Sequence, residues 1–338
     1  MKRLGFASNK QTNKMTTLTF FVSLLAGELE QSGRHGTARA YRSSLNRLLA
    51  FSANGQLTFA DLNPGLLKRY EQLLLSEGCK RNTVSLYMRM LRSICNQAVR
   101  QGIARIPGDL FDEVFTGTDS SEKRAVSPSV IRRLRELDLS GNSTLETARD
   151  LFLLSFYLRG IPFVDLIRLR KSDLNRGIIR YRRSKTGRLL TVAVEPCAQD
   201  IFRKYAPSAV GSIYLLPILT KEGTSGYRQY QNALRRYNLH LHRLSALLGM
   251  KINLTSYVAR HSWATAAYRQ GIPVAVISES LGHSSEKVTY TYLASFDNRT
   301  LSRANREILS LVLPHRNLNS EANYFKKLTN NFKSKAYD

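Results

Sequence analysis

The stretch from residue 254 to residue 292 combines side chains that could carry out chemistry on a phosphodiester. They are Arg260, His261, His283, Tyr290 and Tyr292. The planar guanidinium group of arginine matches phosphate oxygens, and a tyrosine hydroxyl can act as a covalent nucleophile if its pKa is lowered from about 10. The stretch therefore predicts a site that attacks a phosphodiester. An amphipathic helix with a surface arginine and a tyrosine-rich edge fits the same residues equally well.

The charge of the whole chain indicates which molecule such a site would meet. The 338 residues include 51 Lys and Arg against 25 Asp and Glu, a net charge of +26. Each phosphate neutralised by Lys or Arg releases counterions, so this excess predicts binding to a polyanion that weakens steeply with salt. Nucleic acid is the expected partner. A charge kept for solubility or for an anionic membrane is the alternative.

Other features of the sequence argue against membrane and disulfide-rich classes. The longest apolar runs, such as residues 151–158, are too short to span a bilayer, and residues 1–17 lack a hydrophobic signal core. Cys79, Cys95 and Cys197 lie far apart without a C-x-x-C pair, which argues against a disulfide framework and a zinc knuckle. We expect a soluble intracellular protein that does not bind a membrane.

The elements that must position the candidate residues begin with a helical region. Residues 1–14 are basic and lack periodicity, so we expect a flexible arm. Apolar residues then recur at helix spacing over four segments, 19–31, 37–52, 63–78 and 82–100. Asn63-Pro64 opens the third predicted helix and Asn82 caps the fourth. Four helices of this length predict a small bundle over residues 15–102.

Basic residues cluster around the start of the fourth predicted helix. They are Lys80, Arg81, Arg89 and Arg92. We predict that this face is the first DNA-contacting surface. A solvated helix face would have a similar composition.

The chain changes character after the bundle. Residues 103–126 contain proline, glycine and an excess of acidic residues without periodicity, which indicates a linker. Ser127-Pro128 opens a second domain over residues 127–313, and residues 314–338 read as a mobile basic tail. The elements expected in the second domain are helices at 144–158, 164–169, 227–248 and 299–313, and two β-strands at 178–183 and 189–194 around a glycine-containing loop.

Three parts of the second domain could converge on one phosphate, and together they resemble the catalytic domain of the tyrosine recombinases, the phage-integrase family. The matching residues are Arg159 with Asp165 in Leu-Arg-Gly-Ile-Pro-Phe-Val-Asp-Leu, Lys185 in the hairpin, Arg260 in Ala-Arg-His-Ser-Trp-Ala-Thr, His283 in Leu-Gly-His-Ser-Ser, and Tyr292 nine residues beyond it. The resemblance covers nearly the whole chain, because the basic bundle looks like the family's core-binding domain. It implies a mainly α fold with a small antiparallel β-sheet, in which a four-helix SAM-like bundle precedes a mixed α/β catalytic domain.

The resemblance also implies a role for each matching residue. Arg159 and Arg260 would clamp the two non-bridging oxygens and neutralise the charge that builds as the phosphorus becomes five-coordinate. Tyr292 would attack in line and form a 3′-phosphotyrosine. Lys185 would protonate the departing 5′ oxygen, and His283 would hydrogen-bond the phosphate or the nucleophile. No metal and no cofactor are implied, because two guanidinium groups supply the positive charge.

Two positions depart from the family's pattern. The family usually has a histidine three residues before the second arginine, where this chain has Tyr257. Tyrosine can donate a hydrogen bond but is a poor base at neutral pH, so we assign Tyr257 a phosphate-orienting role and leave the base unassigned. The family's first arginine usually stands where this chain has Pro162, so either Arg159 reaches the phosphate from a reshaped loop or the first arginine is missing.

Several of these residues also have an ordinary structural interpretation. Arg159 could satisfy carbonyl groups at a helix end, and Lys185 could be a solvated lysine in a turn. Tyr290 competes with Tyr292 as the nucleophile, although the spacing from His283 favours Tyr292. His261 reads as a structural hydrogen-bonding residue.

The sequence therefore predicts a site-specific DNA recombinase, a tyrosine-type DNA strand transferase that integrates, excises or inverts DNA segments. Its expected partner is double-stranded DNA with inverted-repeat recombination sites, bound by a homotetramer that exchanges the helix at 299–313. We expect a cytoplasmic, nucleoid-associated bacterial protein. The alternatives are a type IB topoisomerase-like nicking and rejoining enzyme, and a DNA-binding regulator that has lost catalysis.

Overall fold

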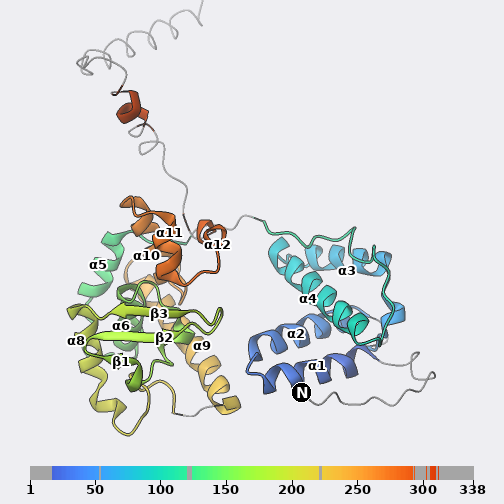
Figure 1. Cartoon of the computed structure of the whole chain (residues 1–338), viewed down its shortest axis with the longest axis horizontal. Coiled ribbons are helices and arrows are strands. Elements are labelled where there is room, and N and C mark those ends of the chain that lie inside the picture. Colours follow the sequence, from blue (N-terminus) through green and yellow to red (C-terminus); the bar gives the residue numbers. More distant parts are fainter. Residues whose placement is uncertain are drawn as a thin grey trace, which may run out of the picture. The chain divides into compact units, whose positions relative to one another are not determined.

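The computed structural model describes residues 17–52, 55–119, 124–220 and 223–291, together with 293, 302, 305–309 and 311 (Figure 1). Contacts divide the chain into two compact units, and each is described by itself. The first unit comprises residues 1–122, 163–176 and 199–256, and the second comprises residues 123–162, 177–198 and 257–338. The predicted arm at 1–14 and the tail at 314–338 lie outside the described residues.

The first unit contains the predicted bundle. Its helices are α1 (Leu18–Gln31), α2 (His35–Phe51), α3 (Pro64–Ser76) and α4 (Arg81–Arg100), and a 3-10 turn, η2 (Phe59–Asp61), precedes α3. The helices bury apolar side chains at helix spacing in one core, which includes Phe21, Leu48, Leu67, Met88 and Ile94. The periodicity predicted this bundle because each helix hides one apolar stripe from water.

The ends of these helices follow capping chemistry, with one correction. The side chain of Asn63 accepts a hydrogen bond from the backbone N–H of Leu66, with Pro64 at the first helical position. The predicted cap at Asn82 is wrong, because the N-cap of α4 is Lys80 and makes no side-chain capping bond. Instead, the Asn82 amide exchanges hydrogen bonds with the backbone of Asp119, at 2.9 and 2.8 Å.

The segment predicted to be a linker packs on the bundle over its first half. Leu110, Phe111 and Val114 are buried in the bundle core. The buried carboxylate of Glu71 accepts a hydrogen bond from the backbone N–H of Phe115 at 2.7 Å. A segment without periodicity can therefore still belong to the core. The predicted domain bounds stay a prediction.

The first unit also contains α7 (Phe163–Leu166), the 3-10 turns η3 (Lys171–Asp173) and η4 (Pro207–Ala209), and the long helix α9 (Gly223–Leu247). The ring of Tyr237 on α9 stacks on the ring of Phe163, with centroids 4.5 Å apart. Helix α8 (Pro196–Tyr205) follows the strands. The predicted helices at 164–169 and 227–248 are thus confirmed, the first of them shorter than expected.

The second unit contains α5 (Pro128–Glu136), α6 (Ser143–Tyr157), α10 (Val258–Arg269), α11 (Val274–Leu281) and α12 (Glu286–Tyr290) (Figure 1). Residues 151–154 of α6 are all buried, so this part of the helix is apolar on every side and lies in the interior. Helix α10 packs on α6, and α11 packs on both α10 and α12.

The predicted β-hairpin is confirmed. Strands β1 (Leu174–Asn175), β2 (Ile178–Arg182) and β3 (Leu189–Ala193) form one sheet in the order β1-β2-β3. In the antiparallel pair β2–β3, Ile179 lies opposite Val192 and Tyr181 opposite Leu190. These four side chains are buried and their neighbours are exposed, as the period of two in a half-buried strand requires. The fold is mainly α with a small antiparallel sheet, as predicted.

Two further findings concern elements expected from the sequence. Among the described residues, no helix combines the length and apolar character needed to cross a bilayer. Of the helix predicted at 299–313, residues 302 and 305–309 are described and are helical. The side chains of Ile308, Leu309 and Leu311 are exposed.

Candidate active site

Arg260 lies at the centre of the candidate site although its side chain is only 1% exposed. It stands on the first turn of α10. Its guanidinium group donates to the carbonyl oxygen of Gly160 at 2.8 Å and to that of Leu281 at 2.6 Å, and its NH2 nitrogen lies 2.9 Å from Nε2 of His283. Because an arginine cannot lose its charge in a protein, these contacts hold a permanent positive charge in the interior.

The carbonyl group of Leu281 is an acceptor because α11 ends there. The last carbonyl groups of a helix have no partner within the helix. Gly282 follows with a φ of 64°, the left-handed conformation that commonly ends helices, and its backbone N–H returns to Glu279 and Ser278. The Leu281 oxygen also accepts a hydrogen bond from NH1 of Arg183 at 2.9 Å. Two guanidinium groups therefore meet at one backbone oxygen.

Arg159 stands in a turn that contacts the backbone of Arg260. Both Arg159 and Gly160 have positive φ, 58° and 70°. A Cβ atom on Gly160 would lie 2.9 Å from Cα of Arg260, so only glycine fits there. Arg159 itself is partly exposed. A non-glycine residue in this conformation is strained, and such strain is often found at functional sites.

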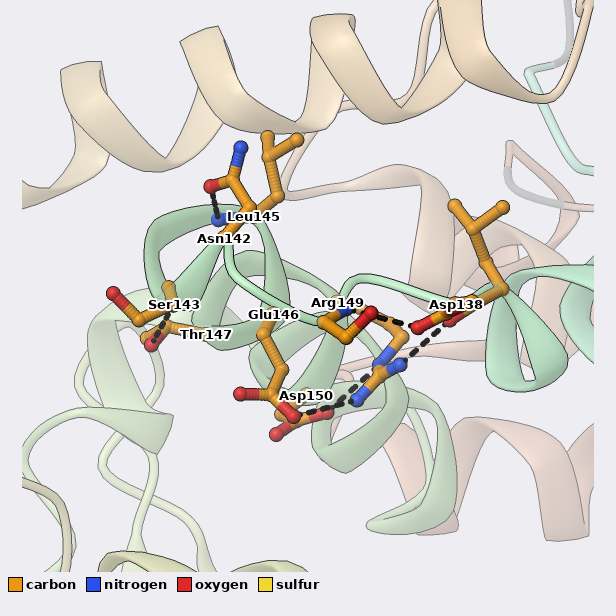
Figure 2. Close-up of polar contacts among 10 residues, drawn as sticks. Asp138, Asn142, Ser143, Leu145, Glu146, Thr147, Arg149 and Asp150 are labelled. Carbon is orange, nitrogen blue, oxygen red and sulfur yellow. Dashed lines mark hydrogen bonds and ion pairs between the residues drawn. The ribbon is translucent and has the colours of Figure 1, made fainter.

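Polar contacts at the start of α6 hold the helix that leads into this turn (Figure 2). The side chain of Asn142 accepts a hydrogen bond from the backbone N–H of Leu145 at 3.1 Å. Arg149 binds the buried carboxylate of Asp150 through Nε at 3.0 Å and the carbonyl oxygen of Leu137 through NH1 at 2.9 Å. Because α6 is fixed at this end and buried along its middle, the position of Arg159 after it is well defined.

The hairpin that carries Lys185 is tied to the loop after α11. Arg183, at the end of β2, is buried and binds the Leu281 oxygen, and Thr186 donates to the carbonyl oxygen of Gly282 at 3.2 Å. Arg188 donates to the carbonyl oxygen of His283 at 3.1 Å. Lys185 is exposed at the tip, and its charge contributes to the lowered pKa of His283. The structure thus brings Lys185 near His283 and Arg260.

His283 is buried and neutral. Its ring contacts Arg260 through Nε2 and the hydroxyl of Thr289 through Nδ1, at 2.8 Å for the second contact. Burial lowers the pKa of His283 to about 3, with further contributions from the charges of Arg260, Arg183 and Lys185. The imidazole therefore carries no charge at neutral pH.

Of the three tyrosines considered for the site, Tyr257 and Tyr290 are among the described residues. Tyr257 is the N-cap residue of α10, one helical turn before Arg260, and its side chain is 41% exposed. Tyr290 is an exposed residue at the end of α12. Tyr292 lies outside the described residues. The structure therefore brings together the turn of Arg159, the hairpin of Lys185, Arg260 and His283, with Tyr257 on the same helix as Arg260.

Of the predicted DNA-contacting residues, Lys80 is the N-cap of α4 and the other three lie on α4, in the first unit. Lys80, Arg81 and Arg89 are exposed and Arg92 is half-buried. The guanidinium of Arg81 lies 4.3 Å from the ring centroid of Phe115, and that of Arg92 lies 5.1 Å from the ring centroid of Phe111. Arg92 also donates to the Phe111 carbonyl oxygen at 3.1 Å. Two of the four cations therefore also support the segment that packs on the bundle.

Sequence reasoning missed two residues of the site, Arg183 and Thr289. A signal existed for Arg183: the alternation that buries Ile179 and Tyr181 continues to residue 183, so an arginine occupies an inward position of a strand. No such signal existed for Thr289, because a single threonine in a short polar helix gives no indication that it is buried. Its burial depends on how α12 packs against the loop that carries His283.

Comparison with protein families gives two matches that together cover most of the chain. Residues 17–108 match the family described as "Phage integrase SAM-like domain", and residues 127–299 match the family described as "Phage integrase family". These matches confirm the predicted order of a SAM-like bundle followed by a catalytic domain.

Individual proteins agree with this result. "Tyrosine recombinase XerA" of Thermococcus kodakarensis is 26% identical over 278 residues, which are 78% of this chain and 86% of that protein. "Tyrosine recombinase XerC" of Roseiflexus castenholzii is 27% identical over 285 residues, 80% of this chain and 86% of that protein. A crystal structure of a lambda integrase dimer bound to a COC' core site has a TM-score of 0.60 at 16% identity, covering 84% of this chain and 80% of the other, which shows a shared fold.

Proposed function

This chain belongs to the phage integrase family and is a site-specific DNA recombinase, and we propose that it breaks and rejoins DNA strands through a 3′-phosphotyrosine on Tyr292. A tyrosyl phosphodiester keeps the energy of the broken bond, so the 5′ hydroxyl of a second strand can displace the tyrosine without ATP. The observation that supports this most is the contact between Arg260 and His283. It fixes a guanidinium group against a histidine that stands nine residues before Tyr292, in a site shared with the Arg159 turn and the Lys185 hairpin.

The two arginines are proposed to bind the non-bridging oxygens of the scissile phosphate. Negative charge builds on these oxygens as Tyr292 attacks, and fixed guanidinium groups stabilise it without reorganising. The contact between Gly160 and the Arg260 backbone supports a role for Arg159, since it joins the turn of the first cation to the helix of the second. Arg159 then replaces the arginine that the family has at the position of Pro162.

Lys185 is proposed to protonate the departing 5′ oxygen, because an alkoxide without a proton is a poor leaving group. Its exposed position at the tip of a hairpin that is tied to the His283 loop supports this role. Tyr257 is proposed to donate a hydrogen bond to the phosphate, which its half-exposed side chain allows. The neutral imidazole of His283 orients Arg260.

The DNA partner is proposed to be a duplex with inverted-repeat sites, contacted by the α4 residues Lys80, Arg81, Arg89 and Arg92. Four protomers would assemble on two such sites, joined by exchange of the helix at 299–313. The exposed apolar side chains of Ile308, Leu309 and Leu311 support the exchange, because they need a partner surface to leave water. The same reaction would serve integration, excision or inversion in a cytoplasmic, nucleoid-associated setting.

Neither alternative reading of the sequence is favoured. A topoisomerase-like enzyme and an inactive DNA-binding regulator would both fit the basic charge. The relatives that match most of the chain are tyrosine recombinases by name, and Arg260 and His283 are present and joined by a contact.

A nicked suicide substrate tests the proposed reaction. DNA with the inverted repeats that flank the gene is nicked just beyond the cleavage position, so that the released fragment cannot rejoin. The wild-type protein should then accumulate a covalent adduct on a denaturing gel. Tyr292→Phe should abolish the adduct, whereas Tyr290→Phe should retain it. An adduct that survives Tyr292→Phe, or its absence from the wild type, would discard this mechanism.

A further inference from the structure

Thr289 is a fully buried residue that has no part in the reaction as proposed above. It lies on α12 with an exposed fraction of 0%, and its hydroxyl is 2.8 Å from Nδ1 of His283. The opposite ring nitrogen of His283, Nε2, lies 2.9 Å from NH2 of Arg260. The imidazole is therefore held between a hydroxyl group and a guanidinium group.

The chemistry of these two partners determines which ring nitrogen carries the proton. A guanidinium group has only N–H donors, so Nε2 must accept and cannot itself be protonated. A neutral imidazole then carries its proton on Nδ1, and this N–H donates to the Thr289 hydroxyl oxygen. The lowered pKa of His283 agrees with a neutral ring. The arrangement thus requires one tautomer of the two.

We propose that Thr289 is a positioning residue for strand cleavage: its hydroxyl accepts the Nδ1 proton that the Arg260 contact requires, and this bond holds the imidazole ring in the orientation in which the Nε2 lone pair faces the Arg260 guanidinium. The proposal rests on the proposed function, because it concerns the orientation of a phosphate-binding arginine. The other tautomer would direct an N–H at the guanidinium, and the two donors would repel each other.

The same hydrogen bond connects the segment before the nucleophile to the rest of the site. Thr289 precedes Tyr292 by three residues. On the other side of Tyr292, Leu293 is buried in a core with Ala264, Ala267, Ile277 and Leu281. The chain is therefore fixed on both sides of the nucleophile, by a polar contact before it and an apolar contact after it. Loss of the polar contact should affect both Arg260 and the segment that leads to Tyr292.

The experiment uses three threonine variants of the full chain, and a fourth variant, His283→Gln, to assign the NMR signals. Thr289→Val has nearly the same shape but lacks the hydroxyl, and Thr289→Ser keeps the hydroxyl. Thr291→Val is the matched control, because the Thr291 hydroxyl is exposed and donates to the carbonyl oxygen of Val288. Nitrogen-15 NMR of labelled histidine reports the tautomer of His283, whose signals are assigned by their absence from His283→Gln. The rate of adduct formation on the nicked substrate is measured in parallel.

In Thr289→Val the imidazole ring loses the bond that holds it against Arg260 and can turn away from the guanidinium group. We therefore expect a mixture of His283 tautomers and adduct formation that is about tenfold slower, since a buried hydrogen-bond partner is lost. Thr289→Ser should restore both readouts, and Thr291→Val should change neither. If His283 keeps its proton on Nδ1 in Thr289→Val, the proposal is overturned, whether or not the rate falls. If the wild type forms no adduct, the proposed function fails, while the NMR result still decides the role of Thr289.

Discussion

The arginines of the helical bundle and those of the second unit are used in different ways. On α4, Arg81 and Arg92 lie over the rings of Phe115 and Phe111 and keep part of their surface in water. In the second unit, Arg183 and Arg260 are buried and donate to backbone carbonyl oxygens. A cation that attracts DNA through its charge alone can be exchanged for another cation with little loss. A buried arginine cannot, because its role depends on the direction of each N–H donor. Burial therefore distinguishes cations that attract DNA from those that orient a reaction.

The largest expected effect comes from a conservative exchange at the buried position. Arg260→Lys keeps the charge but cannot donate to Gly160, Leu281 and His283 in the same geometry. We expect adduct formation to slow by about 10²- to 10³-fold, as when one preorganised donor to a transition state is removed. The measurement is single-turnover adduct formation at saturating DNA. The control is Arg89→Lys at an exposed position of the bundle, which should match the wild type. Equal losses of rate in both variants would show that burial does not separate the two kinds of arginine.

A smaller effect is expected at Arg159, where one substitution should increase stability and decrease activity. Arg159→Gly relieves the positive φ and should raise the free energy of unfolding by about 0.5 to 1 kcal/mol, while removal of the cation slows cleavage. Urea denaturation and the adduct assay measure the two changes. Arg176 is the matched control, since it also has a positive φ and also precedes a glycine with positive φ. The Arg176→Gly variant should be more stable and fully active. A loss of activity in this variant would contradict the specific role of Arg159 in cleavage.

The smallest effects on strand cleavage are expected on α4, where two arginines separate DNA binding from support of the bundle. Arg89→Ala should remove one phosphate contact, lowering the slope of log affinity against log salt by about one without changing stability. Arg92→Ala loses its contacts with Phe111 and should lower the free energy of unfolding by about 1 kcal/mol. Fluorescence anisotropy over a range of salt concentrations and urea denaturation are the measurements. An unchanged salt slope for Arg89→Ala would show that DNA lies elsewhere.

The elements of the fold were predictable where their signal is periodic. The four bundle helices and the hairpin β2–β3 repeat apolar residues at 3.6 and 2 positions, and burial follows that repeat. The packing of Leu110, Phe111 and Val114 was not predictable, because these residues lie in an acidic segment without a repeat. Asn82 was misjudged as a cap because its actual partner, Asp119, is 37 residues away.

The candidate site was predictable in its residue types but not in its contacts. Arg260 and His283 were identified from their types and spacing, whereas the burial of Arg260 depends on acceptors 100 and 21 residues away in the chain. No local pattern encodes such acceptors, because every residue has a carbonyl group. The tautomer of His283 likewise follows only from the contacts that Arg260 and Thr289 make in three dimensions.

The carbonyl oxygen of Leu281 joins the hairpin arginine to the helix arginine, and it belongs to the main chain. Substitution of the buried leucine side chain disturbs the packing of the core but leaves this oxygen in place, so a saturation scan would report the packing role of position 281 and miss the acceptor. Replacement of the amide that follows by an ester, through chemical ligation, would weaken the acceptor and reveal the atom on which both guanidinium groups converge.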